Sequence, residues 1–263
     1  MSYIPPACAL EAATTETSPA AHDATSKKGL VVGRLQNWKG PIVLCEALRH
    51  LGNAAPEFQW LGRDMPFKQA KQSMASYLSK TYPDIWGSKI QPTTLVKSRA
   101  ETAQWQKRAA FVVIPSTWDV FNLTSVEAMV AGQIVICSDG AGAAELIQDG
   151  KNGFTFQNQN AEALADKIAT VQAITPQQSA KIKQAARETI SELLAPQEIA
   201  KKRSEAYKNL FKRGKCARHR RPNAWLENAC RPHAPALEPL AFLEHLPLRD
   251  VVKFLLKRAL KKL

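Results

Sequence analysis

Short apolar runs alternate with amphipathic stretches along the chain from about residue 29. The runs are three to five residues long, as in FVVIP at 111–115, which is the length of a buried strand. The stretches between them repeat apolar residues at the three- and four-residue spacing of one helix face. We expect strands at 29–33, 58–62, 89–91, 111–115, 134–138 and 153–156. We expect helices at 41–51, 67–82, 97–107, 122–131, 142–148, 160–174, 177–194 and 197–212.

Six strands separated by helices predict an α/β fold with a single doubly wound, mostly parallel six-stranded Rossmann-like sheet. Ligands of such sheets bind outside the carboxyl ends of the strands. The loops of interest are therefore those that begin near Gly33, Gly62, Pro115, Ser138 and Phe156.

Three segments differ in composition. Residues 1–28 are rich in Ala, Thr, Ser and Pro, which is typical of a linker, and residues 29–213 form the α/β domain. Residues 214–263 are a basic, proline-containing tail. The net charge is +13, and residues 201–263 hold 17 Lys and Arg against 5 Asp and Glu, so almost all of it lies at this end. Because the domain itself is nearly neutral and aromatic residues are sparse in the tail, we do not expect nucleic-acid binding.

The cysteines and the hydropathy bear on the compartment. Five scattered cysteines are typical of free thiols in a reducing compartment. No apolar run approaches the roughly 20 residues that span a bilayer, and the first residues lack the pattern of a secretory signal. We therefore expect a cytoplasmic protein.

The first candidate motif is GRLQNWKG, directly after the first strand. Gly33 and Gly40 relieve backbone crowding, and Arg34 and Lys39 place two cations at the mouth of a helix. Such cations can hold phosphate oxygens through charge-assisted hydrogen bonds. From these residues alone, two solvated charges on a loop are an equally good interpretation.

The second motif is PSTWDVFNLTSVEAM, in which Asp119 and Glu127 flank the start of a helix. The segment Phe121–Leu123 opens that helix, where unpaired backbone N–H groups can receive an anionic or hydroxyl-rich ligand. Glu127 can accept hydrogen bonds from a vicinal diol. A solvated helix face is the alternative for Glu127, but its neighbours look buried, where an unpaired carboxylate is costly.

The third motif is SDGAGAAELI, a glycine-rich turn between a strand and a helix. Gly140 and Gly142 invite a dinucleotide-binding interpretation. However, the third glycine position holds Glu145, and the turn follows the fifth strand instead of the first. The segment therefore does not favour an NAD site.

Together, these three motifs resemble, in order, those of the retaining family 4 glycosyltransferases, also called glycosyl transferases group 1, which have the GT-B fold. The resemblance covers about residues 29–212. It implies a hexosyltransferase-like enzyme of carbohydrate biosynthesis that transfers sugar with retention, without a metal or cofactor. The donor would be a UDP-sugar or GDP-sugar, and the acceptor a glycan or a lipid-linked molecule.

The resemblance also implies roles for single residues. Arg34 and Lys39 would bind the donor diphosphate, and Glu127 the nucleotide ribose. Asp119 would contact the donor sugar in catalysis. Backbone N–H groups of Phe121, Asn122 and Leu123 would face the phosphate or the sugar, and Gly33, Gly140, Gly142 and Glu145 would support the loops.

Two residues depart from the family pattern. Asp119 stands where the family mostly has Glu, so the carboxylate reaches about one bond less far, and ångström-scale displacements can cost orders of magnitude in rate. Asn122 stands where Gly is usual, and Asn tolerates a left-handed backbone.

A GT-B enzyme has two Rossmann-like domains, of which only the C-terminal, donor-binding one is recognisable here. The opening Tyr3-Ile4-Pro5-Pro6 resembles the segment that joins the two domains. The alternative to a complete enzyme is therefore a truncated or split donor-binding module that needs an N-terminal GT-B domain on another chain.

The tail carries two further patterns. Cys216, His219, Cys230 and His233 repeat a Cys-x2-His spacing, but the pattern matches no standard zinc finger, so we favour coincidence over a zinc site. Residues 246–263 predict a basic amphipathic helix. Such a helix fits an anionic membrane surface at the inner face of the membrane, and equally a helix that docks on protein.

Overall fold

The computed structural model describes residues 28–93 and 98–212. The expected linker up to residue 27, the Cys-x2-His pattern and the helix at 246–263 lie outside the described residues. The chain divides into two units, Met1–Glu205 and Ala206–Leu263, and the sheet and its core belong to the first.

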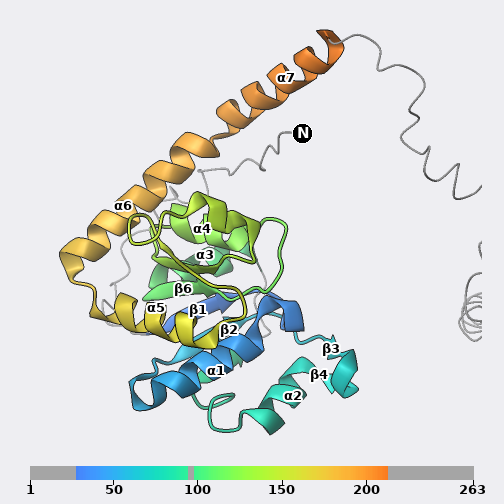
Figure 1. Ribbon diagram of the computed structural model, residues 1–263, viewed down its shortest axis with the longest axis vertical. Helices are drawn as coiled ribbons and strands as arrows, with labels where there is room; N and C mark the ends of the chain where they lie inside the picture. Colours follow the sequence, from blue (N-terminus) through green and yellow to red (C-terminus); the bar gives the residue numbers. More distant parts are fainter. Residues whose placement is uncertain (1–27, 94–97, 213–263) are drawn as a thin grey trace, which may run out of the picture. The chain divides into compact units, whose positions relative to one another are not determined.

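One six-stranded parallel sheet organises the domain (Figure 1). Its strands are β1 (Gly29–Val32), β2 (Phe58–Leu61), β5 (Ile90–Thr93), β6 (Phe111–Ile114), β7 (Val135–Ser138) and β8 (Phe154–Phe156). The helices are α1 (Pro41–Leu51), α2 (Met74–Thr81), α3 (Arg99–Arg108), α4 (Leu123–Val130), α5 (Ala161–Ala173), α6 (Pro176–Leu193) and α7 (Pro196–Lys212). The expected short helix at 142–148 is a 3-10 helix, η5 (Gly142–Leu146).

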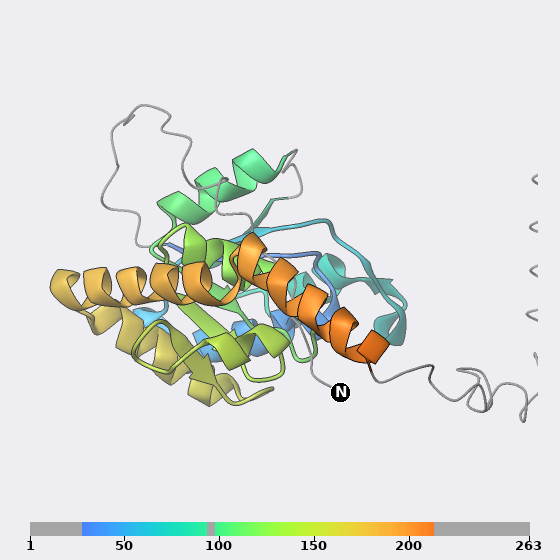
Figure 2. The ribbon, with the colours of Figure 1, turned by 90° about the horizontal axis from the view of Figure 1, so that it is seen from above.

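The strand order is β5-β2-β1-β6-β7-β8, and every neighbouring pair is parallel. This is the doubly wound order, in which the chain first builds the sheet in one direction from β1 and then in the other. Each face of the sheet carries its own apolar layer. Helices α1 and α5 pack on one face, and α4 and α6 on the other (Figures 1 and 2). The predicted fold class is confirmed, with a fully parallel sheet.

The apolar runs are buried because they are covered on both faces. All four residues of β6 are buried, as are all four of β7. Phe58 and Phe111 meet edge-to-face, with ring centroids 5.6 Å apart, and join β2 to β6 across the buried end of β1. This aromatic pair lies at the amino ends of the strands, and the strand order reverses between β1 and β6, whose carboxyl ends are at the opposite edge of the sheet.

The expected helix at 67–82 is wrong in its first half. A hairpin of β3 (Pro66–Phe67) and β4 (Gln72–Ser73) occupies that stretch, and α2 begins only after it. Lys71 has a left-handed backbone, with φ of 52°, which no helix can accommodate. The Ser73 hydroxyl then caps α2 by accepting from the Ser76 backbone N–H at 3.2 Å.

Two further sequence-based expectations concern thiols and membranes. Cys45 and Cys137 are free thiols, as expected. In the described ranges, no helix is long and apolar enough to cross a bilayer.

Candidate functional site

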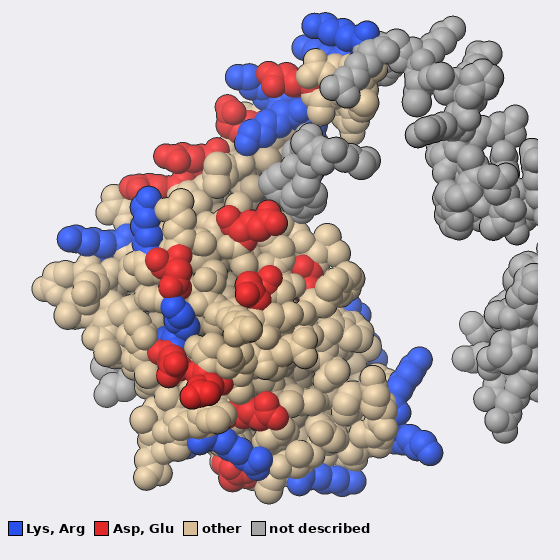
Figure 3. Space-filling view, viewed as in Figure 1, with Lys and Arg blue, Asp and Glu red and all other residues tan. Residues whose placement is uncertain are grey.

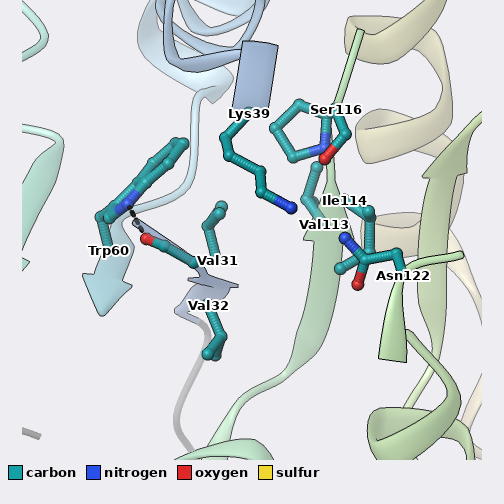
Figure 4. A pocket seen from close by; sticks show the side chains of 10 residues that line it. Val31, Val32, Lys39, Trp60, Val113, Ile114, Ser116 and Asn122 are labelled. Atoms are coloured by element: carbon teal, nitrogen blue, oxygen red, sulfur yellow. Dashed lines mark hydrogen bonds between the residues drawn. The ribbon is translucent and has the colours of Figure 1, made fainter. Parts of the chain in front are cut away.

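Two loops meet where β1 and β6 end. The backbone N–H of Thr117, after β6, donates to the carbonyl of Trp38, after β1, at 2.8 Å. The Trp60 indole Nε1–H donates to the Gly33 carbonyl at 2.9 Å and so fixes the point where the first loop leaves its strand (Figure 4). The loop after β1 (residues 33–40), predicted to bind phosphate, and the loop after β6 (residues 115–122), predicted to face the sugar, therefore lie side by side. They meet at the topological switch point of the sheet, the usual ligand site of this fold.

Gly40 permits this close approach. Its φ of 73° is left-handed, and a Cβ placed on it would lie 1.8 Å from the Pro115 carbonyl oxygen. Only glycine satisfies both conditions. The first turn of α1, which starts at Pro41, therefore packs directly on the end of β6.

Lys39, Asp119 and Asn122 form the polar centre of the site. The Lys39 ammonium lies 2.5 Å from Asp119 Oδ2, and the Asn122 amide donates to the same oxygen at 2.9 Å. Figure 4 shows the Lys39 side chain extended between the ends of β1 and β6 toward Asn122. The Lys39 and Asp119 side chains are 22% and 19% exposed, so the pair is shielded from most of the solvent.

Asn122 is the N-cap of α4. Its Oδ1 accepts from the Ser125 N–H at 3.2 Å, which satisfies one orphan donor of the helix. Its backbone is extended, with φ of −80° and ψ of 102°. The tolerance of Asn for a left-handed backbone is therefore not used here, and Asn122 instead orients Asp119 while it caps the helix.

The glycine-rich segment supports Asp119 from behind. The Asp119 N–H donates to the Gly140 carbonyl at 3.1 Å, and the Asp119 carbonyl accepts from the Gly142 N–H at 3.0 Å. A Cβ at Gly142 would lie 2.1 Å from the Val120 carbonyl oxygen. These glycines are explained by backbone packing against the Asp119 loop.

A small niche lies under the polar centre. Its volume is about 10 Å³, enough for one water molecule at most. Lys39 and Asn122 line it together with backbone and side chains at the ends of β1 and β6. A ligand larger than one water molecule does not fit within this niche.

The remaining predicted site residues lie on the same two loops, on α4 and on η5. Arg34 is exposed on the first loop. Phe121 is half-buried against the α4 side of the core, and Leu123 is 45% exposed at the start of α4. Glu127 is half-buried in the second turn of α4, and Glu145 is exposed in η5.

Two contributors carry no motif in the sequence. Trp60 holds the Gly33 carbonyl from β2, and Asn158 donates from its Nδ2 to the Thr117 carbonyl at 2.8 Å. The Asn158 backbone N–H also donates to Asp139 Oδ1 at 2.7 Å. Both residues act across the sheet, so only the strand order reveals them.

The site offers cations, which can bind anionic oxygens, and carboxylates, which can accept hydrogen bonds from hydroxyl groups. Burial, with Asp119 and Asp139 nearby, raises the pKa of the Cys137 thiol to about 12, so it is not a nucleophile at neutral pH. Within residues 28–93 and 98–212, no three His, Cys, Asp or Glu side chains come together as metal ligands. The cation beside Asp119 is the Lys39 ammonium.

Comparisons with known proteins identify the family. Residues 26–173 match the family model described as glycosyl transferases group 1. A D-inositol 3-phosphate glycosyltransferase of Streptomyces scabiei is 27% identical over 146 residues, which cover 52% of this chain and 31% of that protein. The chain thus spans about a third of the length of this curated relative.

Solved structures share the fold. A glycosyltransferase from Rickettsia africae matches with a TM-score of 0.68 and 22% identity, over 80% of this chain and 57% of that one. Anabaena HepE in complex with UDP matches with a TM-score of 0.61 and 23% identity, over 71% of this chain and 50% of that one. With the family model matched over more than half of its length, the chain belongs to the glycosyl transferases group 1 family.

Proposed function

We propose that this chain binds a UDP-sugar or GDP-sugar over the ends of β1 and β6 and serves in transfer of the sugar to a glycan or lipid-linked acceptor. The observation that carries the proposal is the Lys39–Asp119 pair at the switch point of the sheet, between two loops joined through their backbones. The presence of UDP in the HepE structure supports a nucleotide as the ligand class.

In the proposed complex, the donor diphosphate replaces Asp119 as the partner of the Lys39 ammonium. The exposed Arg34 guanidinium approaches the same phosphates, because both cations stand on the loop that follows β1. The N-terminus of α4 adds backbone N–H groups, which favour negative charge. Glu127, one turn further along, accepts from the ribose hydroxyls.

Lys39 and Arg34 then stabilise the negative charge that develops on the leaving diphosphate as the bond to the sugar breaks. Asp119, released from Lys39 but still held by the Asn122 amide, faces the sugar. We propose that transfer proceeds with retention and without a metal or cofactor. The Asp119 side chain is about one bond shorter than that of Glu. In the proposed complex, the sugar therefore lies closer to the Asp119 loop, so that the carboxylate still reaches it.

Exposed apolar side chains stand next to the candidate donor site. Trp38, Trp118, Val120 and Leu123 are 45% to 67% exposed on the two loops and the start of α4. Such a group of exposed apolar side chains is typical of a surface that meets another molecule. We propose that it faces the acceptor, or the second GT-B domain that would carry the acceptor.

The alternative is a donor-binding module whose turnover needs another chain. The match to the Streptomyces protein spans 31% of that protein. The cytoplasmic location and an association with anionic membrane remain predictions, the latter because residues 246–263 lie outside the described ranges.

The test is calorimetric titration of the purified chain with UDP, GDP, UDP-glucose and GDP-mannose. Saturable binding of one nucleotide and its sugar supports the proposal, and binding of none contradicts it. Transfer of radiolabelled sugar by the isolated chain would rule out the incomplete module. Nucleotide binding without transfer, restored by an added N-terminal GT-B domain, would establish it.

A further inference from the structure

The hairpin β3–β4 forms a basic rim beside the donor site. It follows β2 at the carboxyl edge of the sheet and carries exposed Arg63, Lys68 and Lys71. Figure 3 shows Lys and Arg side chains along the edge of the molecule where Figure 1 draws β3 and β4. Among the described residues, none of these three cations has an acidic partner within ion-pair distance.

The sheet register brings one of these cations beside a cation of the donor loop. The parallel pairs Val32–Leu61 and Leu35–Asp64 have the same offset, which places Arg34 opposite Arg63. The Leu35 N–H donates to the Arg63 carbonyl at 2.9 Å, so the segments that follow β1 and β2 remain paired at this point. Arg34 and Arg63 follow the ends of β1 and β2, and like charges on neighbouring segments repel each other. An anion that binds both guanidinium groups would relieve this repulsion.

The only acidic side chain in this rim is already engaged. Asp64 Oδ1 accepts from the Ala75 backbone N–H, in the first turn of α2, at 3.0 Å. That bond directs the carboxylate to the helix start, where negative charge is stabilised. Asp64 therefore anchors the hairpin to α2 and does not form an ion pair with Arg63, Lys68 or Lys71.

The hairpin is also a firm scaffold with an open hollow. Phe67 and Tyr77 pack edge-to-face at 4.9 Å between ring centroids, and the Met74 N–H donates to the Met65 carbonyl at 2.9 Å. The hollow beside it has a volume of about 650 Å³ and is lined by residues 63–68 and 71–73. That volume admits a ligand of sugar-phosphate size.

We propose that this rim binds a phosphate monoester or diester separate from the donor diphosphate. The Arg34–Arg63 register places this anion site next to the donor site of the proposed function. Arg63 provides planar bidentate contacts, and Lys68 and Lys71 provide point charges. The phosphate can come from a soluble sugar phosphate or from a lipid headgroup.

The experiment is a titration of the 15N-labelled full chain with inorganic phosphate at constant ionic strength, followed by amide chemical shifts. Two triple variants are compared: Arg63→Gln/Lys68→Gln/Lys71→Asn, and a control, Lys107→Gln/Lys151→Gln/Lys181→Gln. Asn is used at position 71 because it tolerates the left-handed backbone there. The control removes three exposed cations outside the rim. Lys68→Gln alone replaces the triple variant if that variant fails to fold.

The proposal predicts shifts in residues 62–73 and at least about tenfold weaker phosphate binding in the rim variant, with the control unchanged. Equal phosphate affinity in both variants, or no shift in 62–73 of the wild type, would overturn it. A parallel UDP titration, read at residues 33–40, tests the donor site separately. Shifts in 62–73 without UDP binding keep the rim site and reject the proposed function.

Vesicles distinguish the two sources of phosphate. Phosphatidylglycerol vesicles are compared with phosphatidylcholine vesicles in a flotation assay on the same variants. Loss of phosphatidylglycerol binding in the rim variant alone supports a lipid headgroup. Unchanged vesicle binding beside lost inorganic-phosphate binding supports a soluble phosphate.

Discussion

Replacing Asp119 by Asn should tighten nucleotide binding. In the free chain, the Lys39 ammonium is bound to Asp119 Oδ2 at 2.5 Å, and a diphosphate has to break or share that contact. Asn keeps an oxygen for the Asn122 amide but loses the charge that holds Lys39. The same change removes a negative charge that repels the incoming phosphates.

The exposure of the pair sets the magnitude. Exposed ion pairs contribute about 0.2–1 kcal/mol, and hydrogen bonds to charged groups about 1.5–3 kcal/mol. Side chains that are 22% and 19% exposed lie between these cases, at about 1–1.5 kcal/mol. Release of this competing interaction corresponds to roughly fivefold to tenfold tighter UDP binding, since about 1.4 kcal/mol is a factor of ten.

Isothermal titration calorimetry of wild type, Asp119→Asn, Lys39→Met and the double variant with UDP measures the effect. We expect tighter binding in Asp119→Asn and weaker binding in Lys39→Met. In the Lys39→Met background, the Asn substitution should give only the gain that comes from removing the repulsion between Asp119 and the phosphates. Thermal melting controls for loss of structure. Fivefold weaker binding of UDP to Asp119→Asn would refute the reasoning, because Asp119 would then be a nucleotide ligand and not a competitor.

Three further predictions concern the framework of the site. Asn122→Ala should lower the free energy of unfolding by about 1–2 kcal/mol in urea melts, because it removes the α4 cap, whereas Asn122→Ser should retain most of the stability; equal losses would contradict the cap. Gly40→Ala should lower the free energy of unfolding by about 3 kcal/mol or more, because its Cβ would clash with Pro115. Gly150→Ala is the control, since Gly150 has a similar φ but open space around the added Cβ, and equal losses in the two variants would exclude the clash. Burial raises the pKa of the Cys45 and Cys137 thiols to about 12, so both should resist alkylation by iodoacetamide from pH 7 to 9 in the folded protein and react in urea. Peptide mass mapping measures this, and labelling of the folded protein at pH 9 would contradict it.

Much of the fold follows from local pattern, because short buried strands and helix faces leave clear periodicities. α1 begins and ends at the predicted residues, since Pro41 suits the first helical turn and Gly52 ends it. The stretch 67–82 misled because Phe67, Ala70, Met74 and Leu78 repeat at helical spacing. The left-handed Lys71 and the Met65–Met74 hydrogen bond are tertiary features that periodicity does not encode.

The site was predictable in its residue types but not in its contacts. The motifs place Lys39 and Asp119 on two loops, yet only the strand order brings them together across 80 positions of sequence. The sequence comparison pointed only to the tolerance of Asn122 for a left-handed backbone, whereas in the structure its side chain caps α4. The facing of Arg34 and Arg63 depends on register alone.

The central claim is that a nucleotide diphosphate is held over the ends of β1 and β6 by Lys39 and the loop from Gly33 to Gly40. A crystal structure of the chain with UDP tests this most directly. We expect the diphosphate within hydrogen-bond distance of Lys39 Nζ, with Asp119 no longer bound to that ammonium. UDP bound elsewhere, with the Lys39–Asp119 pair intact, would contradict it.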